Sequence, residues 1–120
     1  MEIDVSSLGD RLVRIRLSGR LDTHGVDRVE TRFVASVVPG ANSAIVDLSQ
    51  VDFVSSMGIR MLVSTARNLK TRQASLAVFG APDPVNQVFE AIALRKILPI
   101  CATEDEALDA VASASRPAGG

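Results

Sequence analysis

Short apolar segments with a strand-like pattern alternate with amphipathic helical segments along most of this chain of 120 residues. Val13, Ile15 and Leu17 alternate with polar residues, and this period of two predicts a half-buried strand. The compact apolar segments at residues 44–48 and 76–79 predict two further strands, each followed by a helical pattern. Strands that alternate with helices form a largely parallel sheet covered by helices, so we expect a single α/β domain.

The two ends of the chain depart from this alternation. At the N-terminus, Ile3 and Val5 predict a first strand that forms an antiparallel hairpin with the strand around Ile15. Toward the C-terminus, residues 97–100 predict a short edge strand, because Pro99 has no amide hydrogen to donate to a sheet. The expected order is β-β-α-β-α-β-α-β-α, which is a mixed, mostly parallel sheet with about four helices.

Apolar residues that recur on one face predict the helices. The first helix is capped by Asp22 or Thr23, the second spans about residues 56–70, and the third begins at Asp83, which suits a cap before Pro84. The inward-facing residues are expected to be Val26, Val29, Phe33 and Val37, then Gly58, Met61, Leu62, Thr65 and Leu69, then Val85, Val88, Phe89 and Ile92, and finally Ala107, Leu108 and Val111.

The composition argues against several classes of function. With 13 basic and 14 acidic residues, four Phe and no Trp or Tyr, the chain lacks the basic face and stacking side chains of a nucleic-acid binder. Cys101 is the only cysteine, so it cannot form an internal disulfide, and it is expected to be a small core residue. His24 is the only histidine and has no partner at metal-ligand spacing. We therefore expect no metal, no cofactor and no enzymatic activity.

The ends of the chain and its hydropathy predict where the protein works. Residues 1–4 do not resemble the basic start of a signal peptide, and no apolar stretch approaches the roughly 20 residues that span a bilayer. We expect a cytoplasmic protein without direct membrane insertion. Residues 1–112 are expected to form the domain, and the small, polar residues 113–120 a disordered tail.

The passage from a buried strand into a helix at residues 46–62 is the most informative segment for function. It brings Ser55 and Ser56 to the start of the helix, where backbone amides lack internal acceptors. A serine at this place caps the helix, presents a hydroxyl for phosphorylation, or does both. A phosphate there would change the surface charge without dismantling the core.

Two parts of the chain resemble a known family. They are residues 19–22 (Gly-Arg-Leu-Asp) and residues 47–49 with 53–59 (Asp-Leu-Ser and Phe-Val-Ser-Ser-Met-Gly-Ile). Both are similar to segments of the STAS domain and, more narrowly, of bacterial anti-sigma factor antagonists. The resemblance covers roughly residues 2–112 and implies the STAS fold.

The family's central motif commonly reads Asp-Ser-Ser/Thr-Gly-Leu, and its first hydroxyl residue accepts a phosphate. By this resemblance, Ser56 is the acceptor and Gly58 is the motif glycine. Ser55 stands where Asp is common and is the alternative acceptor. Met57 stands where a second hydroxyl is common, and Ile59 replaces the leucine.

The resemblance implies a partner-switching protein. Its unmodified form would bind an anti-sigma factor that is also a serine kinase of the histidine-kinase-like ATPase class, and this binding would free a sigma factor. Phosphorylation by that partner, using Mg-ATP, would end binding, and a PP2C-type phosphatase would reset the switch. The alternative is an interaction subunit of the same fold that is never phosphorylated and belongs to a membrane transporter or another signalling complex.

The expected partner surface comprises Asp22, Ser55, Ser56, Met57, Gly58, Arg60 and Arg67. Several of these residues also have a purely structural interpretation. Asp22 could only cap a helix, Gly58 could only allow tight packing, and the two arginines could only face solvent. Asp47 could balance a nearby cation at the end of a strand.

Overall fold

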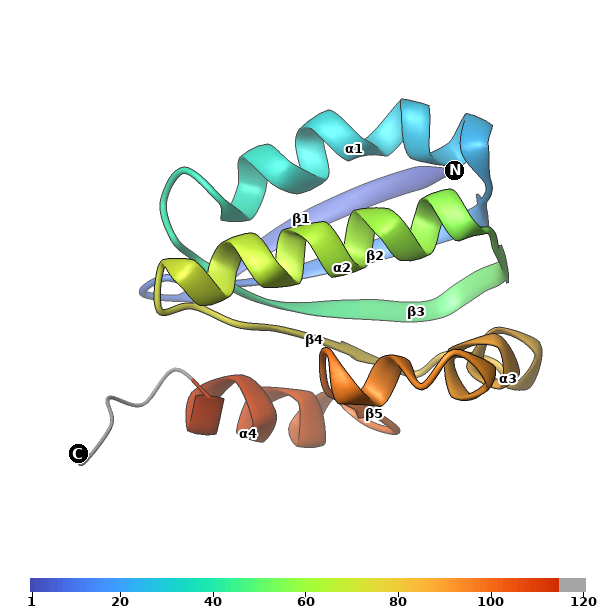
Figure 1. Cartoon of the computed structure of the whole chain (residues 1–120). Coiled ribbons are helices and arrows are strands. Elements are labelled where there is room, and N and C mark those ends of the chain that lie inside the picture. The colour runs from blue at the N-terminus through green and yellow to red at the C-terminus, as the bar shows by residue number, and fades with distance from the viewer. Residues whose placement is uncertain (115–120) are drawn as a thin grey trace.

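Five strands form one mixed sheet in this computed structural model, which describes residues 1–114 (Figure 1). The order across the sheet is β1-β2-β3-β4-β5. The strands are β1 (Glu2–Gly9), β2 (Leu12–Leu21), β3 (Ser43–Val54), β4 (Leu76–Phe79) and β5 (Ile100–Cys101). Strands β1 and β2 pair antiparallel, and the other neighbours pair parallel. The predicted α/β fold with an N-terminal hairpin is confirmed.

The helices of the described residues follow the predicted order, with one short 3-10 helix in addition. They are α1 (Thr23–Val37), α2 (Ser56–Thr71), α3 (Asp83–Ala91), the 3-10 helix η1 (Leu94–Lys96) and α4 (Glu104–Ala114). Figure 1 shows α1 and α2 side by side along the sheet. Asp22, one of the two predicted residues, is the N-cap of α1.

Two hydrophobic clusters lie on opposite faces of the sheet. The larger cluster lies between the sheet and α1, α2 and α3, and includes Ile15, Phe33, Val46, Met61 and Phe89. The smaller cluster lies under α4 and is formed by Ile45, Ala77, Phe79, Ala107 and Val111. Successive side chains of a strand point to opposite faces, which is why Ile45 and Val46 belong to different clusters.

Strand β3 is longer than the predicted segment at residues 44–48. It continues to Val54, and its second half pairs with the last residues of β2, where Leu21 lies opposite Val54. Ser49 and Gln50 are exposed in this half, and two consecutive polar residues interrupt the apolar pattern by which a strand is predicted from sequence. The extension carries the chain directly to the start of α2.

The predicted edge strand begins three residues later than expected and ends one residue later. The prediction was residues 97–100, but β5 is Ile100–Cys101, and Ile97 is 43% exposed in the preceding turn. Pro99 has only a carbonyl to offer, and that oxygen accepts a hydrogen bond from the Val78 amide at 3.1 Å. The predicted edge position is correct.

Helix α3 differs from its prediction at both ends. Pro82 rather than Asp83 is the N-cap, and Asp83 is the first helical residue, with no side-chain capping bond. The helix ends before Ile92, which is 47% exposed instead of facing inward. Val85 and Phe89 are buried as predicted.

Two further expectations concern the C-terminal tail and membrane-spanning segments. Helix α4 ends at Ala114, and residues 115–120 of the predicted tail lie outside the described residues. Among the helices of residues 1–114, none combines the length and the apolar character that crossing a bilayer requires.

Candidate functional site

The start of α2 is anchored to the end of β2 by Ser55. The Ser55 amide donates to the carbonyl oxygen of Leu21 at 2.9 Å, and the Ser55 hydroxyl donates to the same oxygen at 3.1 Å. The Ser55 Oγ also accepts a hydrogen bond from the Gly58 amide at 3.4 Å, which makes Ser55 the N-cap of α2. The hydroxyl of Ser55 is therefore engaged in holding the fold.

Ser56 differs from Ser55 although it follows directly in the chain. It is the first residue of α2 and is exposed, and its hydroxyl has no hydrogen-bond partner within residues 1–114. The Gly58 amide is taken by the cap and the Ile59 amide by the Ser55 carbonyl. The amides of Ser56 and Met57 thus remain as open donors at the positive end of the helix.

Gly58 is buried and packs against Leu21. A Cβ at this position would lie 2.7 Å from Leu21 Cγ and 2.8 Å from the Leu21 carbonyl oxygen. The packing interpretation of this glycine is therefore the one that the structure supports. Without a side chain at this position, α2 can approach the end of β2 closely enough for the Ser55 hydrogen bonds to form.

Asp22 lies at the corresponding start of α1, next to Leu21 in the chain. Its Oδ1 accepts a hydrogen bond from the Gly25 amide at 2.8 Å, and its Oδ2 lies 3.5 Å from Arg20 Nε. The Gly25 hydrogen bond and the Arg20 guanidinium hold the pKa of Asp22 below its usual range. The carboxylate is thus a charged helix cap, and it is partly exposed at the same end of the sheet as Ser56.

Arg20 and Phe53 form a surface pair beside these helix starts that the sequence analysis missed. The guanidinium carbon of Arg20 lies 4.2 Å from the centroid of the Phe53 ring, within the range of a cation–π contact. Phe53 is 39% exposed and Met57 is 36% exposed. A signal was available, because Phe53 is one of only four Phe residues in a chain without Trp or Tyr and stands two residues before Ser55.

The exposed face of α2 carries Arg60 and Arg67. With 3.6 residues per turn, residues 56, 60 and 67 fall on the same side of the helix. Arg60 is one turn from Ser56, whereas Arg67 is about 16 Å further along the axis from Ser56 at 1.5 Å per residue. The structure therefore brings Arg60 to the helix start and leaves Arg67 well away from it.

Asp47 forms an ion pair within the sheet. Its Oδ2 lies 3.1 Å from Arg16 Nε on β2, and its Oδ1 accepts a hydrogen bond from the Ser49 amide at 2.9 Å. Burial acts to raise the pKa of Asp47, but hydrogen bonds from Ser49 and the Arg16 charge outweigh it, so the pKa lies below its usual range. The predicted cation is Arg16, and its ion pair with Asp47 joins β2 to β3 within the sheet.

Metal and thiol chemistry have little support in the described part of the chain. Residues 1–114 contain no group of three or more His, Cys, Asp or Glu side chains that could hold a metal ion. Burial and the nearby Glu106 raise the pKa of the Cys101 thiol, while Arg95 acts in the opposite direction. Cys101 is half-buried and packs against the smaller hydrophobic cluster, so it lies at the edge of the predicted core rather than fully inside it.

The chain is similar in sequence and in fold to known proteins. The sequence profile of the STAS domain matches residues 6–107. BtrV of Bordetella bronchiseptica, a candidate anti-sigma factor antagonist, is 26% identical over 98 residues, which cover 82% of this chain and 84% of that protein. An anti-sigma factor antagonist from Mycobacterium paratuberculosis has a TM-score of 0.80 at 26% identity, covering 92% of this chain and 93% of that one. The anti-sigma factor antagonist SpoIIAA in its unphosphorylated form has a TM-score of 0.77 at 25% identity, covering 93% and 97%.

The profile match begins in β1 and ends within α4, so it includes both helix starts and the strands that lead to them. It also includes the two motifs, at residues 19–22 and 47–59, on which the resemblance was based. The chain belongs to the STAS domain family.

Proposed function

We propose that this protein is an anti-sigma factor antagonist whose binding is switched by phosphorylation of Ser56. In its unmodified form it binds an anti-sigma factor in the cytoplasm through the surface around the start of α2. The observation that carries the proposal is the contrast between two adjacent serines. Ser55 is hydrogen-bonded to Leu21, whereas Ser56 is exposed on the first turn of the helix.

The proposed partner surface combines apolar and charged side chains near Ser56. Phe53 and Met57 supply exposed apolar area, and Arg20 covers the Phe53 ring. Aromatic and arginine side chains are enriched among the residues that dominate protein–protein binding. Arg60 adds a positive charge one turn along α2, and Asp22 a negative one at the start of α1.

Phosphorylation of Ser56 would act locally. The phosphate would add about −1.5 to −2 charges at neutral pH, and the open amides of the first helical turn can donate hydrogen bonds to it without unfolding the domain. Within a docked interface the same charge would lose water and meet apolar neighbours such as Met57. Because each tenfold loss of affinity needs only about 1.4 kcal/mol, an unpaired phosphate suffices to separate the partners.

The chemistry of the switch belongs to the proposed partners. The anti-sigma factor would be a serine kinase of the histidine-kinase-like ATPase class, and a PP2C-type phosphatase would restore the unmodified form. The supporting facts are the family membership and the likeness to anti-sigma factor antagonists, one of which, SpoIIAA, is described in an unphosphorylated form. On this proposal the protein itself is a ligand and a substrate, with residues 1–112 as its working domain.

The direct test is to incubate the protein with the anti-sigma factor that it binds and Mg-ATP, and then to locate phosphate by peptide mass spectrometry. We expect phosphate on Ser56 in the wild type and in Ser55→Ala, and none in Ser56→Ala. Phosphate on Ser55, or on neither serine with an active kinase, would contradict the assignment.

A binding experiment separates the switch from the alternative of an interaction subunit that is never phosphorylated. Ser56→Asp should weaken binding to the anti-sigma factor by at least about tenfold. Ser64→Asp is the matched control. Ser64 is exposed on the same helix, about 12 Å along the axis from Ser56, and the substitution introduces the same charge. If the two variants bind alike and as well as the wild type, the interaction subunit becomes the better description.

A further inference from the structure

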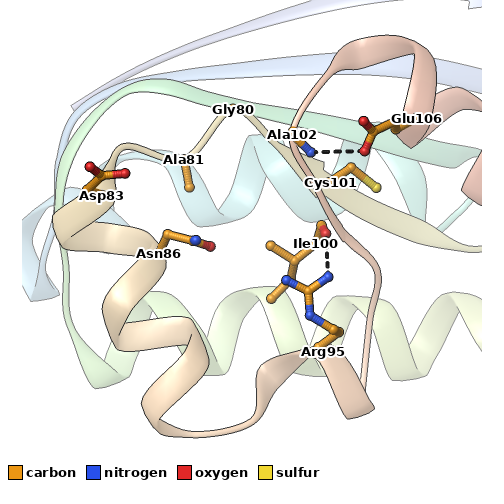
Figure 2. A pocket seen from close by; sticks show the side chains of 9 residues that line it. All are labelled: Gly80, Ala81, Asp83, Asn86, Arg95, Ile100, Cys101, Ala102 and Glu106. Atoms are coloured by element: carbon orange, nitrogen blue, oxygen red, sulfur yellow. Dashed lines mark hydrogen bonds between the residues drawn. The ribbon is translucent and has the colours of Figure 1, made fainter.

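The chain leaves β4 and β5 toward opposite faces of the sheet. After β4 it enters α3, whose Val85 and Phe89 join the larger cluster with α1 and α2. After β5 it enters α4, which covers the other face through Ala107 and Val111. In open α/β sheets, ligand sites form beyond the carboxyl ends of neighbouring strands whose connections diverge in this way. A hollow of about 490 Å³ lies at this place (Figure 2).

The hollow is lined by polar side chains from three different elements. Asp83 and Asn86 come from α3, Arg95 from η1 and Glu106 from α4. Figure 2 shows Asn86 and Arg95 directed into the space between α3 and β5, with Glu106 across from them on the far side of Cys101. One guanidinium and two carboxylates thus surround a space that also has apolar walls.

Arg95 is held in position while keeping most of its donors free for a ligand. Its Nη1 donates to the Ile100 carbonyl oxygen at 3.0 Å. A guanidinium has five N–H donors in a planar fork, so this bond leaves an edge that can bind a carboxylate. The Asn86 amide, which lines the same wall, can add a further donor to that carboxylate.

Glu106 supplies a fixed negative charge on the opposite side. Its Oε2 accepts a hydrogen bond from the Ala102 amide at 3.3 Å, which orients the carboxylate and leaves Oε1 for another donor. Glu106 raises and Arg95 lowers the pKa of the Cys101 thiol because their charges are opposite, so both charges lie close to Cys101. The hollow therefore holds one guanidinium, that of Arg95, and the carboxylates of Glu106 and Asp83 on the elements around it.

We infer that this hollow binds a small zwitterion with one carboxylate and one ammonium group, the class to which free amino acids belong. The carboxylate lies on Arg95 and Asn86, and the ammonium group donates to Glu106. A ligand with negative charge alone would face both Asp83 and Glu106, and a ligand with positive charge alone would face Arg95. This inference is independent of the proposed switch, because Ser56 does not line the hollow.

The test is a titration of the isotope-labelled full chain with each standard L-amino acid up to about 10 mM, followed by two-dimensional amide NMR. At least one should shift the amides of Gly80, Cys101 and Ala102. Its decarboxylated amine and its deaminated acid should each bind at least about tenfold weaker. The inference is overturned if no amino acid shifts these amides, or if either half-molecule binds as well as the whole.

Variants locate the binding groups. Arg95→Gln and Glu106→Gln should each raise the dissociation constant by about tenfold, and Asn86→Ala should raise it without removing a backbone contact. Lys96→Gln is the matched control, because Lys96 is the neighbouring cation on η1 and does not line this hollow. Affinity equal to that of Lys96→Gln in all three pocket variants would place the ligand elsewhere and reject the site. If Arg95→Gln proves unstable, the same result in Asn86→Ala and Glu106→Gln rejects it.

Discussion

The carbonyl oxygen of Leu21 accepts two hydrogen bonds from Ser55, one from its amide at 2.9 Å and one from its hydroxyl at 3.1 Å. The last residue of β2 thereby positions both the backbone and the side chain of the residue before α2. Because Ser55 is occupied in this way, the exposed hydroxyl at this corner belongs to Ser56. On the proposed function, Ser55 stabilises the fold and Ser56 is modified, and each role can be tested.

Replacing the two serines in turn should separate capping from phosphorylation. Ser55→Ala should lower the free energy of unfolding by about 1 kcal/mol, because the Gly58 amide and the Leu21 carbonyl each lose a partner. Ser56→Ala should change it by less than about 0.5 kcal/mol, as is usual for an exposed residue without contacts. Urea unfolding followed by circular dichroism measures both, and a larger loss for Ser56→Ala would reverse the assignment of roles.

Gly58→Ala should destabilise the domain although alanine favours helices. The added methyl group would collide with Leu21, whose backbone carbonyl cannot move aside without disturbing β2. We expect a net loss of about 1–3 kcal/mol, despite the gain of about 1 kcal/mol in helix propensity.

The matched control for this glycine is Gly40→Ala. Gly40 is exposed, and a Cβ there would only touch the end of the flexible Asn42 side chain at 3.1 Å. Its effect should stay within about 0.5 kcal/mol. Thermal unfolding of both variants is sufficient, and equal melting temperatures would show that α2 can shift away from Leu21.

Thr65→Val should stabilise the protein. Thr65 is 3% exposed on the inner face of α2, and among the described residues its Oγ1 has no hydrogen-bond partner. Valine has the same shape and a similar helix propensity, but it removes a buried hydroxyl that lacks a partner. We expect a gain of about 1 kcal/mol in the free energy of unfolding. A loss measured by urea unfolding would mean that this hydroxyl is satisfied in solution.

Asp47 should contribute to the acid sensitivity of the fold. Its pKa is lower in the folded state than the value of about 3.9 in an unfolded chain, so its contribution is complete above that value. The contribution is lost as the pH falls through the lower, folded pKa. Asp47→Asn should therefore be less stable than the wild type at pH 7 by about 1–2 kcal/mol, because Arg16 and Ser49 lose a charged acceptor.

The free energy of unfolding of Asp47→Asn should also fall less steeply with decreasing pH than that of the wild type. Urea titrations from neutral pH down to about pH 2.5 should show the stability difference shrinking below about pH 4, where the wild-type carboxylate becomes protonated. A difference that stays constant over this range would exclude Asp47 as a source of the pH dependence.

Phe53→Ala should reduce partner binding far more than stability. The ring is 39% exposed and contacts Arg20 at the surface beside Ser56, so little core packing is lost. If the proposed anti-sigma factor docks here, affinity should fall by at least about tenfold, as for a buried aromatic anchor. Leu8→Ala is the control, because Leu8 is 37% exposed in the β1 strand near the hairpin turn, away from Leu21. Equal binding of the two variants by calorimetry would remove Phe53 from the interface.

The parts of the fold that follow from local periodicity were predictable from the sequence. The hairpin, the buried strands around Val46 and Val78 and the inner face of α2 each have a regular apolar pattern, and the structure confirms them. The second half of β3 was missed because Ser49 and Gln50 face outward, and its pairing with β2 depends on residues more than 30 positions away. Ile97 and its neighbours have the apolar composition of a strand, yet the residues that pair with β4 are Ile100 and Cys101, which follow Pro99.

The sequence by itself determined the family and the pair of serines, because both depend on residue types at fixed local spacing. Only the tertiary structure decided that Ser55 is bound to Leu21 while Ser56 is exposed, and that Arg20 lies over Phe53. These contacts join residues more than 30 positions apart, and their geometry depends on how β2 and β3 end side by side. A local sequence pattern does not show which distant residues will be in contact, so the structure was needed to distinguish the two hydroxyl groups.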